Sequence, residues 1–132
     1  MPSNAGKRDR GEYYTPKSIA YYLTRKALKY YLNDSNQYDL GQMLLNPDFT
    51  SLSIEQERIE QINILDPSCG EGIFLKTAIS ILHDLKSAFY KKSANSKILS
   101  NEEIYQHIIF KNIHGVDINN SKIDKYNQRL LD

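Results

Sequence analysis

A glycine-rich turn between a short apolar run and an amphipathic segment constrains this 132-residue chain more than any other feature. The turn reads DPSCGEG over residues 66–72, and it follows the apolar run at 62–66. Beyond the glycines, apolar residues recur at helical spacing to residue 89. This pattern predicts a strand, a tight loop and a helix. In such a loop a ligand can approach the backbone closely and meet free amide groups.

The rest of the chain predicts an α/β fold in which helices separate two strands. A helix is expected over 16–32 with Thr15 as its N-cap, and short helical turns over 53–60. Ser100 and Glu103 form a capping box before the next helix, a second strand follows at 113–118, and a last helix runs to residue 130. This order predicts a parallel pair with a right-handed crossover, the start of a doubly wound sheet.

The first helix carries its apolar and aromatic residues at helical spacing, which predicts an inward face formed by Ile19, Ala20, Leu23, Ala27, Tyr30 and Tyr31. Its tyrosine pairs, 21–22 and 30–31, favour packing over a platform for stacked bases. Complete sheets of this kind average about 5–6 strands, and only two are visible here. We therefore expect the chain to be the front part of a larger domain.

Charge and cysteine content narrow the class of protein. Lys and Arg total 17 against 16 Asp and Glu, so the net charge of +1 gives no overall nucleic-acid footprint. No apolar run is long enough to span a membrane. Cys69 is the single cysteine, which excludes an internal disulfide and fits a reducing compartment such as the cytoplasm. The spacing of His83, His107 and His114 does not match a zinc site.

The glycine loop matches neither of two familiar nucleotide-binding motifs. Leu75 stands where the dinucleotide fingerprint needs its third glycine, and no Gly-Lys-Ser/Thr follows as in a P-loop. A tight turn with no ligand stays open as an alternative. At the end of the second strand, Asp117 offers two oxygens that can accept the hydroxyls of a ribose. The same residue is equally suited to form a turn or to cap the last helix.

Three ordered motifs carry a family resemblance. GEYYTP at 11–16, DPSCGEGIFL at 66–75 and GVDIN at 115–119 together resemble the amino-terminal part of N6-adenine DNA methyltransferases. That family is S-adenosylmethionine-dependent and of class I, and the motif order is similar to type I modification subunits and type IIG enzymes. The resemblance implies a partial Rossmann-like methyltransferase fold. It divides the chain into a basic arm (1–10), a helical region (11–61) and the first βαβα part of the cofactor domain (62–132).

The resemblance also implies a cofactor site. Asp66 would hold the amino group of S-adenosylmethionine, Asp117 would bind its ribose hydroxyls, and Ile118 would pack on its adenine ring. The residues at 14–16 would line the methionine end, and the two loop glycines would admit the cofactor. The implied set is Tyr14, Thr15, Pro16, Asp66, Pro67, Cys69, Gly70, Gly72, Asp117 and Ile118.

The catalytic motif of that family, Asn/Asp-Pro-Pro-Tyr/Phe, does not occur in this sequence. The nearest match, Asn46-Pro47-Asp48-Phe49, lacks the second proline and precedes the glycine loop, so it is predicted to be a turn. No catalytic residue and no metal ligand are therefore assigned, and the chain alone is expected not to methylate.

The expected function is the cofactor-binding part of an adenine-specific DNA methyltransferase from a restriction-modification system. DNA would be bound through downstream regions, and an exposed sheet edge predicts a homodimer. A fragment of a protein-glutamine or RNA methyltransferase, or a non-catalytic binding module, stays open.

Overall fold

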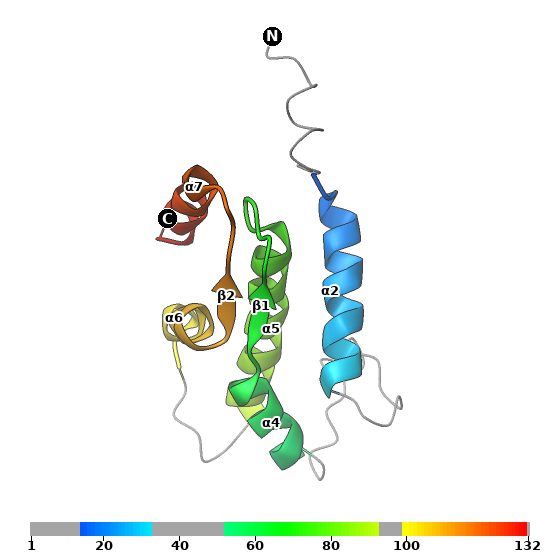
Figure 1. Ribbon diagram of the computed structural model, residues 1–132. Coiled ribbons are helices and arrows are strands. Elements are labelled where there is room, and N and C mark those ends of the chain that lie inside the picture. The colour runs from blue at the N-terminus through cyan, green and yellow to red at the C-terminus, as the bar shows by residue number, and fades with distance from the viewer. Residues whose placement is uncertain (1–13, 33–51, 93–98, 132) are drawn as a thin grey trace.

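The computed structural model describes residues 14–32, 52–92 and 99–131 (Figure 1). The predicted basic arm and the predicted turn at 46–49 lie outside the described residues. In chain order the elements are α2 (Lys17–Leu32), α4 (Leu52–Gln61), β1 (Ile64–Asp66), α5 (Ile73–Lys92), α6 (Asn101–Lys111), β2 (Ile113–Gly115) and α7 (Asn120–Leu131). The expected order of helices and strands is confirmed.

The two strands form a parallel sheet. Ile64 pairs with Ile113, and Asp66 pairs with Gly115. In Figure 1 both strands run upward, α5 lies behind them, and β2 stands to the left of β1, which makes the crossover right-handed. The chain is thus a mostly helical α/β fold with a two-stranded parallel sheet packed against helices, as predicted.

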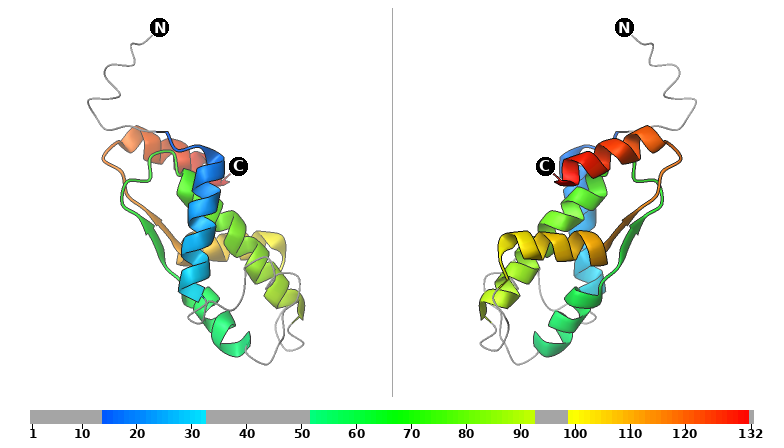
Figure 2. Two further views of the ribbon diagram at one scale, coloured as in Figure 1. Left: turned by 90° about the vertical axis from the view of Figure 1, so that its right-hand side faces the viewer. Right: turned by 90° about the vertical axis from the view of Figure 1, so that its left-hand side faces the viewer.

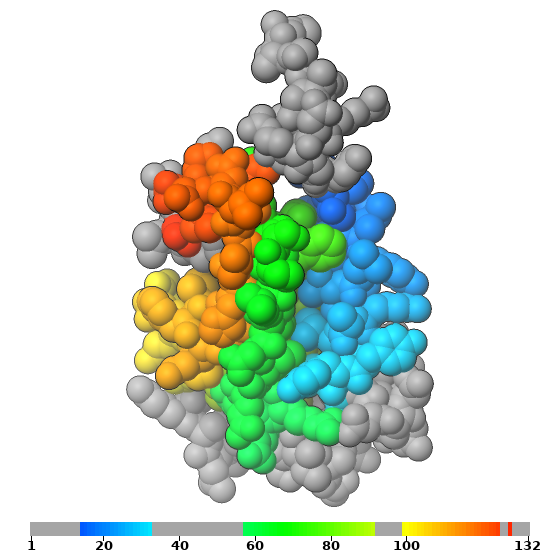
Figure 3. Space-filling view, viewed as in Figure 1, coloured from blue at the N-terminus to red at the C-terminus, as the bar shows by residue number. Residues whose placement is uncertain are grey.

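The core lies between the sheet and the helices on one of its faces (Figure 2). Leu75, Leu82, Leu85 and Ile108 are each no more than 1% exposed, and they pack with Ile113 of β2. The opposite face of the sheet lies at the surface in Figure 3. There Leu65 is 61% exposed and Val116 is 54% exposed. The described chain therefore covers only one face of its sheet.

Helix α2 packs differently from the sequence expectation. Ala20, Leu28 and Leu32 are its buried residues, whereas Ile19, Leu23, Tyr30 and Tyr31 are each 47–59% exposed. Of the predicted inward face only Ala20 is buried, because α2 packs against α5 and α4 with Ala20, Leu28 and Leu32. The tyrosines flank this buried stripe or point away from it, so the packing interpretation of both tyrosine pairs is also wrong: Tyr21 is 46% and Tyr22 is 57% exposed.

Several element ends are shifted by local hydrogen bonds. The Pro16 carbonyl accepts from Ala20 N–H at 3.0 Å, so Pro16, not Thr15, occupies the capping position of α2. Strand β1 begins two residues later than predicted because the Ile62 carbonyl accepts from the Asn112 side chain at 2.7 Å. The capping box of α6 is present as predicted, with Ser100 and Glu103 bonded reciprocally.

A polar cluster of Glu60, Lys86, Tyr90 and His107 ties α4, α5 and α6 together at the end of the sheet opposite the glycine loop. The Lys86 ammonium is fully buried and lies 3.0 Å from a Glu60 carboxylate oxygen and 3.1 Å from His107 Nδ1. Tyr90 donates to the other Glu60 oxygen. Burial lowers the pKa of Lys86 and of His107. Burial alone would raise the pKa of Glu60, but the bonds from Tyr90 and Lys86 bring it below its ordinary value.

Candidate functional site

The loop after β1 is a compact turn fixed by backbone hydrogen bonds. Ser68 N–H donates to Asp66 Oδ1 at 3.0 Å, and Gly72 N–H donates to the Cys69 carbonyl at 2.7 Å. Cys69 N–H reaches across to the Val116 carbonyl at 2.9 Å. Val116 N–H returns a bond to the Asp66 carbonyl at 2.9 Å. Pairing of the two strands therefore continues beyond Gly115 and holds the base of the loop, although β2 itself is shorter than predicted.

The two glycines of the loop adopt backbone conformations that disfavour other residues. Gly70 has φ of 52° and Gly72 has φ of 78°, both in the left-handed region. Helix α5 begins directly after this turn, and the Gly72 carbonyl already accepts from Lys76 N–H at 2.8 Å. The glycines are thus required by the turn itself, whether or not a ligand binds there.

Asp117 connects the second strand to the glycine loop. Its Oδ1 accepts from Asn119 N–H and its Oδ2 accepts from Gly70 N–H, each at 2.8 Å. These two N–H groups lower the pKa of the Asp117 carboxyl, so it is charged at neutral pH. Each oxygen keeps a further lone pair for another donor. The turn-forming alternative is confirmed, while the capping alternative is wrong because Asn119 caps α7 through its bond from Ser121 N–H at 3.2 Å.

Cys69 is packed under the loop. It is 5% exposed, and burial followed by the nearby charges of Asp66 and Asp117 raises the pKa of its thiol. A thiol held protonated and buried is a poor nucleophile. The prediction that Cys69 is a small packed residue is confirmed.

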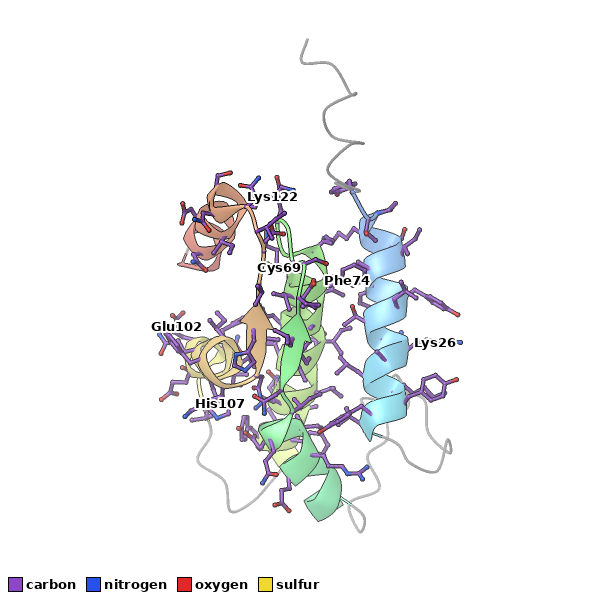
Figure 4. All side chains as sticks on the ribbon, viewed as in Figure 1. Lys26, Cys69, Phe74, Glu102, His107 and Lys122 are labelled. Carbon is purple, nitrogen blue, oxygen red and sulfur yellow. The ribbon has the colours of Figure 1, made fainter. Side chains whose placement is uncertain are left out.

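Cys69 marks the position of this loop in Figure 4. The other expected site residues adjoin Asp66, Asp117 or the amino end of α2 in the chain. Pro67 is exposed and follows Asp66 in the turn. Ile118 is fully exposed next to Asp117. Tyr14, Thr15 and Pro16 precede the amino end of α2, where Tyr14 is 80% exposed. Hydrogen bonds bring together Asp66, Ser68, Cys69, Gly70 and Asp117, and the remaining residues stay predictions for the site.

Gly115 is a residue of this region that sequence reasoning missed. A Cβ at this position would lie 2.8 Å from Leu75 Cδ1 and 3.1 Å from Cys69 Sγ. Strand β2 therefore approaches the start of α5 and the loop so closely that any larger residue would displace the Leu75 and Cys69 side chains. The signal was present, since a glycine inside a predicted strand marks a close backbone approach.

Replacing Gly115 by alanine should destabilise the fold. Leu75 is fully buried, so its side chain must shift within the core to admit the added methyl group. Overpacking of this kind costs about 1–3 kcal/mol of the free energy of unfolding. Urea unfolding followed by circular dichroism measures it, with Val116→Ala at the neighbouring exposed position as the control. Equal stability of Gly115→Ala and the wild type would show that β2 does not sit this tightly against α5.

Within the described residues, no group of three His, Cys, Asp or Glu side chains is placed to hold a metal ion. None of the described helices is long and apolar enough to cross a membrane. The arrangement instead offers two carboxylates, one at the end of each parallel strand, beside a glycine turn. In α/β sheets, small ligands are generally bound at the carboxyl ends of the parallel strands, where these two carboxylates lie.

Comparison with known proteins gives a distant relative. The chain is 26% identical over 144 residues to a protein of Methanocaldococcus jannaschii described as a type II restriction enzyme and methyltransferase. The alignment covers 95% of this chain but 12% of that protein. No family model matches the chain. No solved structure matches it at a significant level.

Proposed function

We propose that this chain is the cofactor-binding part of an adenine-specific N6 DNA methyltransferase of a restriction-modification system. The observation that carries the proposal is the pair of carboxylates, Asp66 and Asp117, at the ends of adjacent parallel strands beside the glycine turn. The similarity to a protein described as a restriction enzyme and methyltransferase supports the same class of protein.

The chemistry of the residues fits S-adenosylmethionine, which supplies the methyl group when bound. Asp66 is partly exposed at the mouth of the loop, where its carboxylate can accept from the ammonium group of the methionine part. Asp117 is charged and can accept from the ribose hydroxyls with its remaining lone pairs. The exposed side chain of Ile118 provides apolar surface for the adenine ring. Tyr14, Thr15 and Pro16 complete the methionine end in this proposal.

The reaction itself requires residues that this chain does not contain. The family's catalytic tetrapeptide is absent from the sequence, and the chain spans 12% of the length of its relative. We assign DNA recognition and methyl transfer to the rest of a longer protein. The 132-residue chain alone should bind the cofactor and transfer no methyl group.

The test of the reaction uses the longer gene product together with methyl-labelled S-adenosylmethionine. It is offered duplex DNA, RNA and a protein extract in parallel, and the labelled products are digested and separated. Label in N6-methyladenine from DNA is the expected result. Label in glutamine or RNA would replace the DNA assignment by one of the alternatives. No label in any arm, together with cofactor binding, would make the chain part of a non-catalytic binding module.

A free strand edge predicts self-association of the 132-residue chain. In the described part of the chain β1 pairs only with β2, so the edge of β1 that carries the backbone groups of Leu65 has no partner strand. Beside that edge lies an open groove of about 550 Å³ between α2, β1 and α5, lined by Leu23, Tyr31, Ile64 and Phe74. A second copy that pairs its own β1 there would cover both the edge and the groove.

Light scattering over a range of protein concentrations measures this association. We expect the apparent mass to rise from one chain to two as the concentration increases. A proline at position 65 should prevent the rise, because it removes the N–H that the partner strand needs. Particles of one-chain mass at every concentration would show that the edge is not an interface between copies.

A further inference from the structure

Helix α2 carries a concentrated positive charge that the rest of the chain balances. Its sixteen residues include Lys17, Arg25, Lys26 and Lys29 and no acidic residue, whereas the whole chain has a net charge of +1. At 100° per residue, the buried stripe lies on one side of the helix, and the opposite side presents Tyr22, Lys26 and Tyr30 together with the apolar Ile19 and Leu23, while the half-buried Lys29 lies at its margin. We call Tyr22, Lys26, Lys29 and Tyr30 the outer face of α2.

The outer face combines cations with exposed aromatic rings. Lys26 and Tyr22 are one helical turn apart, and the ammonium lies 5.3 Å from the centre of the tyrosine ring. The hydrogen bond with Tyr22 raises the pKa of Lys26, so the side chain stays charged. Tyr22 is 57% exposed and Tyr30 is 59% exposed. Figure 4 shows Lys26 directed away from the body of the molecule.

We propose that the outer face of α2 is a docking surface for the phosphate backbone of duplex DNA. Lysine and arginine neutralise phosphates and release the bound counterions, and tyrosine hydroxyls donate hydrogen bonds to phosphate oxygens. The helix presents both kinds of group on one side. The choice of DNA rests on the proposed function, whereas the charge of the surface is independent of it.

The alternative partner for such a surface is an acidic protein. Burial of the lysines against protein would require carboxylates placed to meet each of them, because unpaired buried charges are costly. A phosphate backbone supplies negative charge along its whole length, so a row of cations on one helix can engage it in many registers. Backbone contact of this kind positions DNA without reading its sequence.

The experiment measures binding of the 132-residue chain to a short fluorescent DNA duplex by anisotropy at several salt concentrations. The test variant is Lys26→Gln/Lys29→Gln. Its control is Lys91→Gln/Lys111→Gln, which removes the same charge from exposed positions on α5 and α6. Circular dichroism checks that each variant is folded. Each phosphate contact contributes about 0.9 to the slope of log K against log salt, so the test variant should lower the slope by about 2.

The control should leave that slope within the error of the wild type. Tyr22→Phe/Tyr30→Phe should weaken binding without changing the slope, because it removes hydroxyl donors and keeps every charge. Equal loss of slope in the test and control variants would overturn the proposal, as would no binding at low salt or tighter binding of an acidic peptide than of the duplex. Titration of the same samples with S-adenosylmethionine keeps the two proposals apart. DNA binding without cofactor binding rejects the proposed function, and the reverse result rejects the surface.

Discussion

Replacement of Lys86 by methionine should lower the free energy of unfolding by about 3 kcal/mol, because it leaves the partly buried Glu60 carboxylate without its cation. The Lys86 side chain is 0% exposed and the Glu60 side chain is 28% exposed. That residual exposure places the expected cost at the lower end of the range of about 3–5 kcal/mol for broken buried pairs. Methionine keeps the volume of the side chain, so the effect reports the lost charge and not a cavity.

The double variant Glu60→Gln/Lys86→Met separates the pair from the packing around it. Removal of both charges should recover most of the loss, since no unpaired ion remains. Lys91→Met, at an exposed position on the same helix, is the matched control and should change stability by less than about 0.5 kcal/mol. Urea unfolding measures all three variants. If Lys86→Met were as stable as the wild type, the cluster would not hold α4 and α6 to α5.

The pH dependence of this loss follows from the pKa of Glu60. Its value in the folded protein is lowered from 4.5, so its contribution is present above that pH and is lost as the pH falls through the lowered folded value. In Lys86→Met the same carboxyl lacks its cation and is protonated more readily. The difference in stability between wild type and Lys86→Met should therefore shrink as the pH falls below 4.5.

Replacement of Asp117 by alanine should weaken binding of S-adenosylmethionine by roughly tenfold to a hundredfold. Hydrogen bonds to a charged group contribute about 1.5–3 kcal/mol, which corresponds to that range of affinity. The change also removes the acceptor of Gly70 N–H, which positions the loop. Calorimetric titration with the cofactor measures the dissociation constant.

Two further variants separate the ligand contact from support of the loop. Asp117→Asn keeps one oxygen for a backbone N–H and removes the charge, so it should retain most of the stability and lose most of the affinity. Asp124→Ala removes an exposed carboxylate from α7 and should leave the affinity unchanged. An unchanged dissociation constant in Asp117→Ala would show that Asp117 stabilises the turn and does not contact the cofactor.

Sequence reasoning succeeded where a local pattern determines a local structure. The apolar run, the glycines and the helical spacing that follows placed β1, the turn and α5 within three residues. The capping box of α6 was readable because both of its bonds join residues three positions apart. The parallel pairing followed from the helices that separate the two strands in the sequence.

Apart from the helix caps at Thr15 and Asp117, which were misplaced by one and two residues, the failures concern contacts between distant parts of the chain. Which residues of α2 face inward depends on how that helix packs against α5. Because apolar and aromatic residues occur on most sides of α2, their spacing did not single out Ala20, Leu28 and Leu32 as the buried residues. The polar cluster joins residues from three helices, so no local spacing reveals it. Asp117 was correctly singled out, but its bond to Gly70 spans 47 positions and required the folded chain.

Calorimetric titration of the 132-residue chain with S-adenosylmethionine, and separately with NAD, tests the central claim most directly. We propose that Asp66 accepts from an ammonium group and Asp117 from a ribose, and Leu75 stands where a dinucleotide site needs glycine. We predict saturable binding of S-adenosylmethionine that is weakened in Asp117→Ala, and weaker or no binding of NAD. Tighter binding of NAD, or binding of S-adenosylmethionine that is unchanged in Asp117→Ala, would contradict the assignment of this loop as a methyl-donor site.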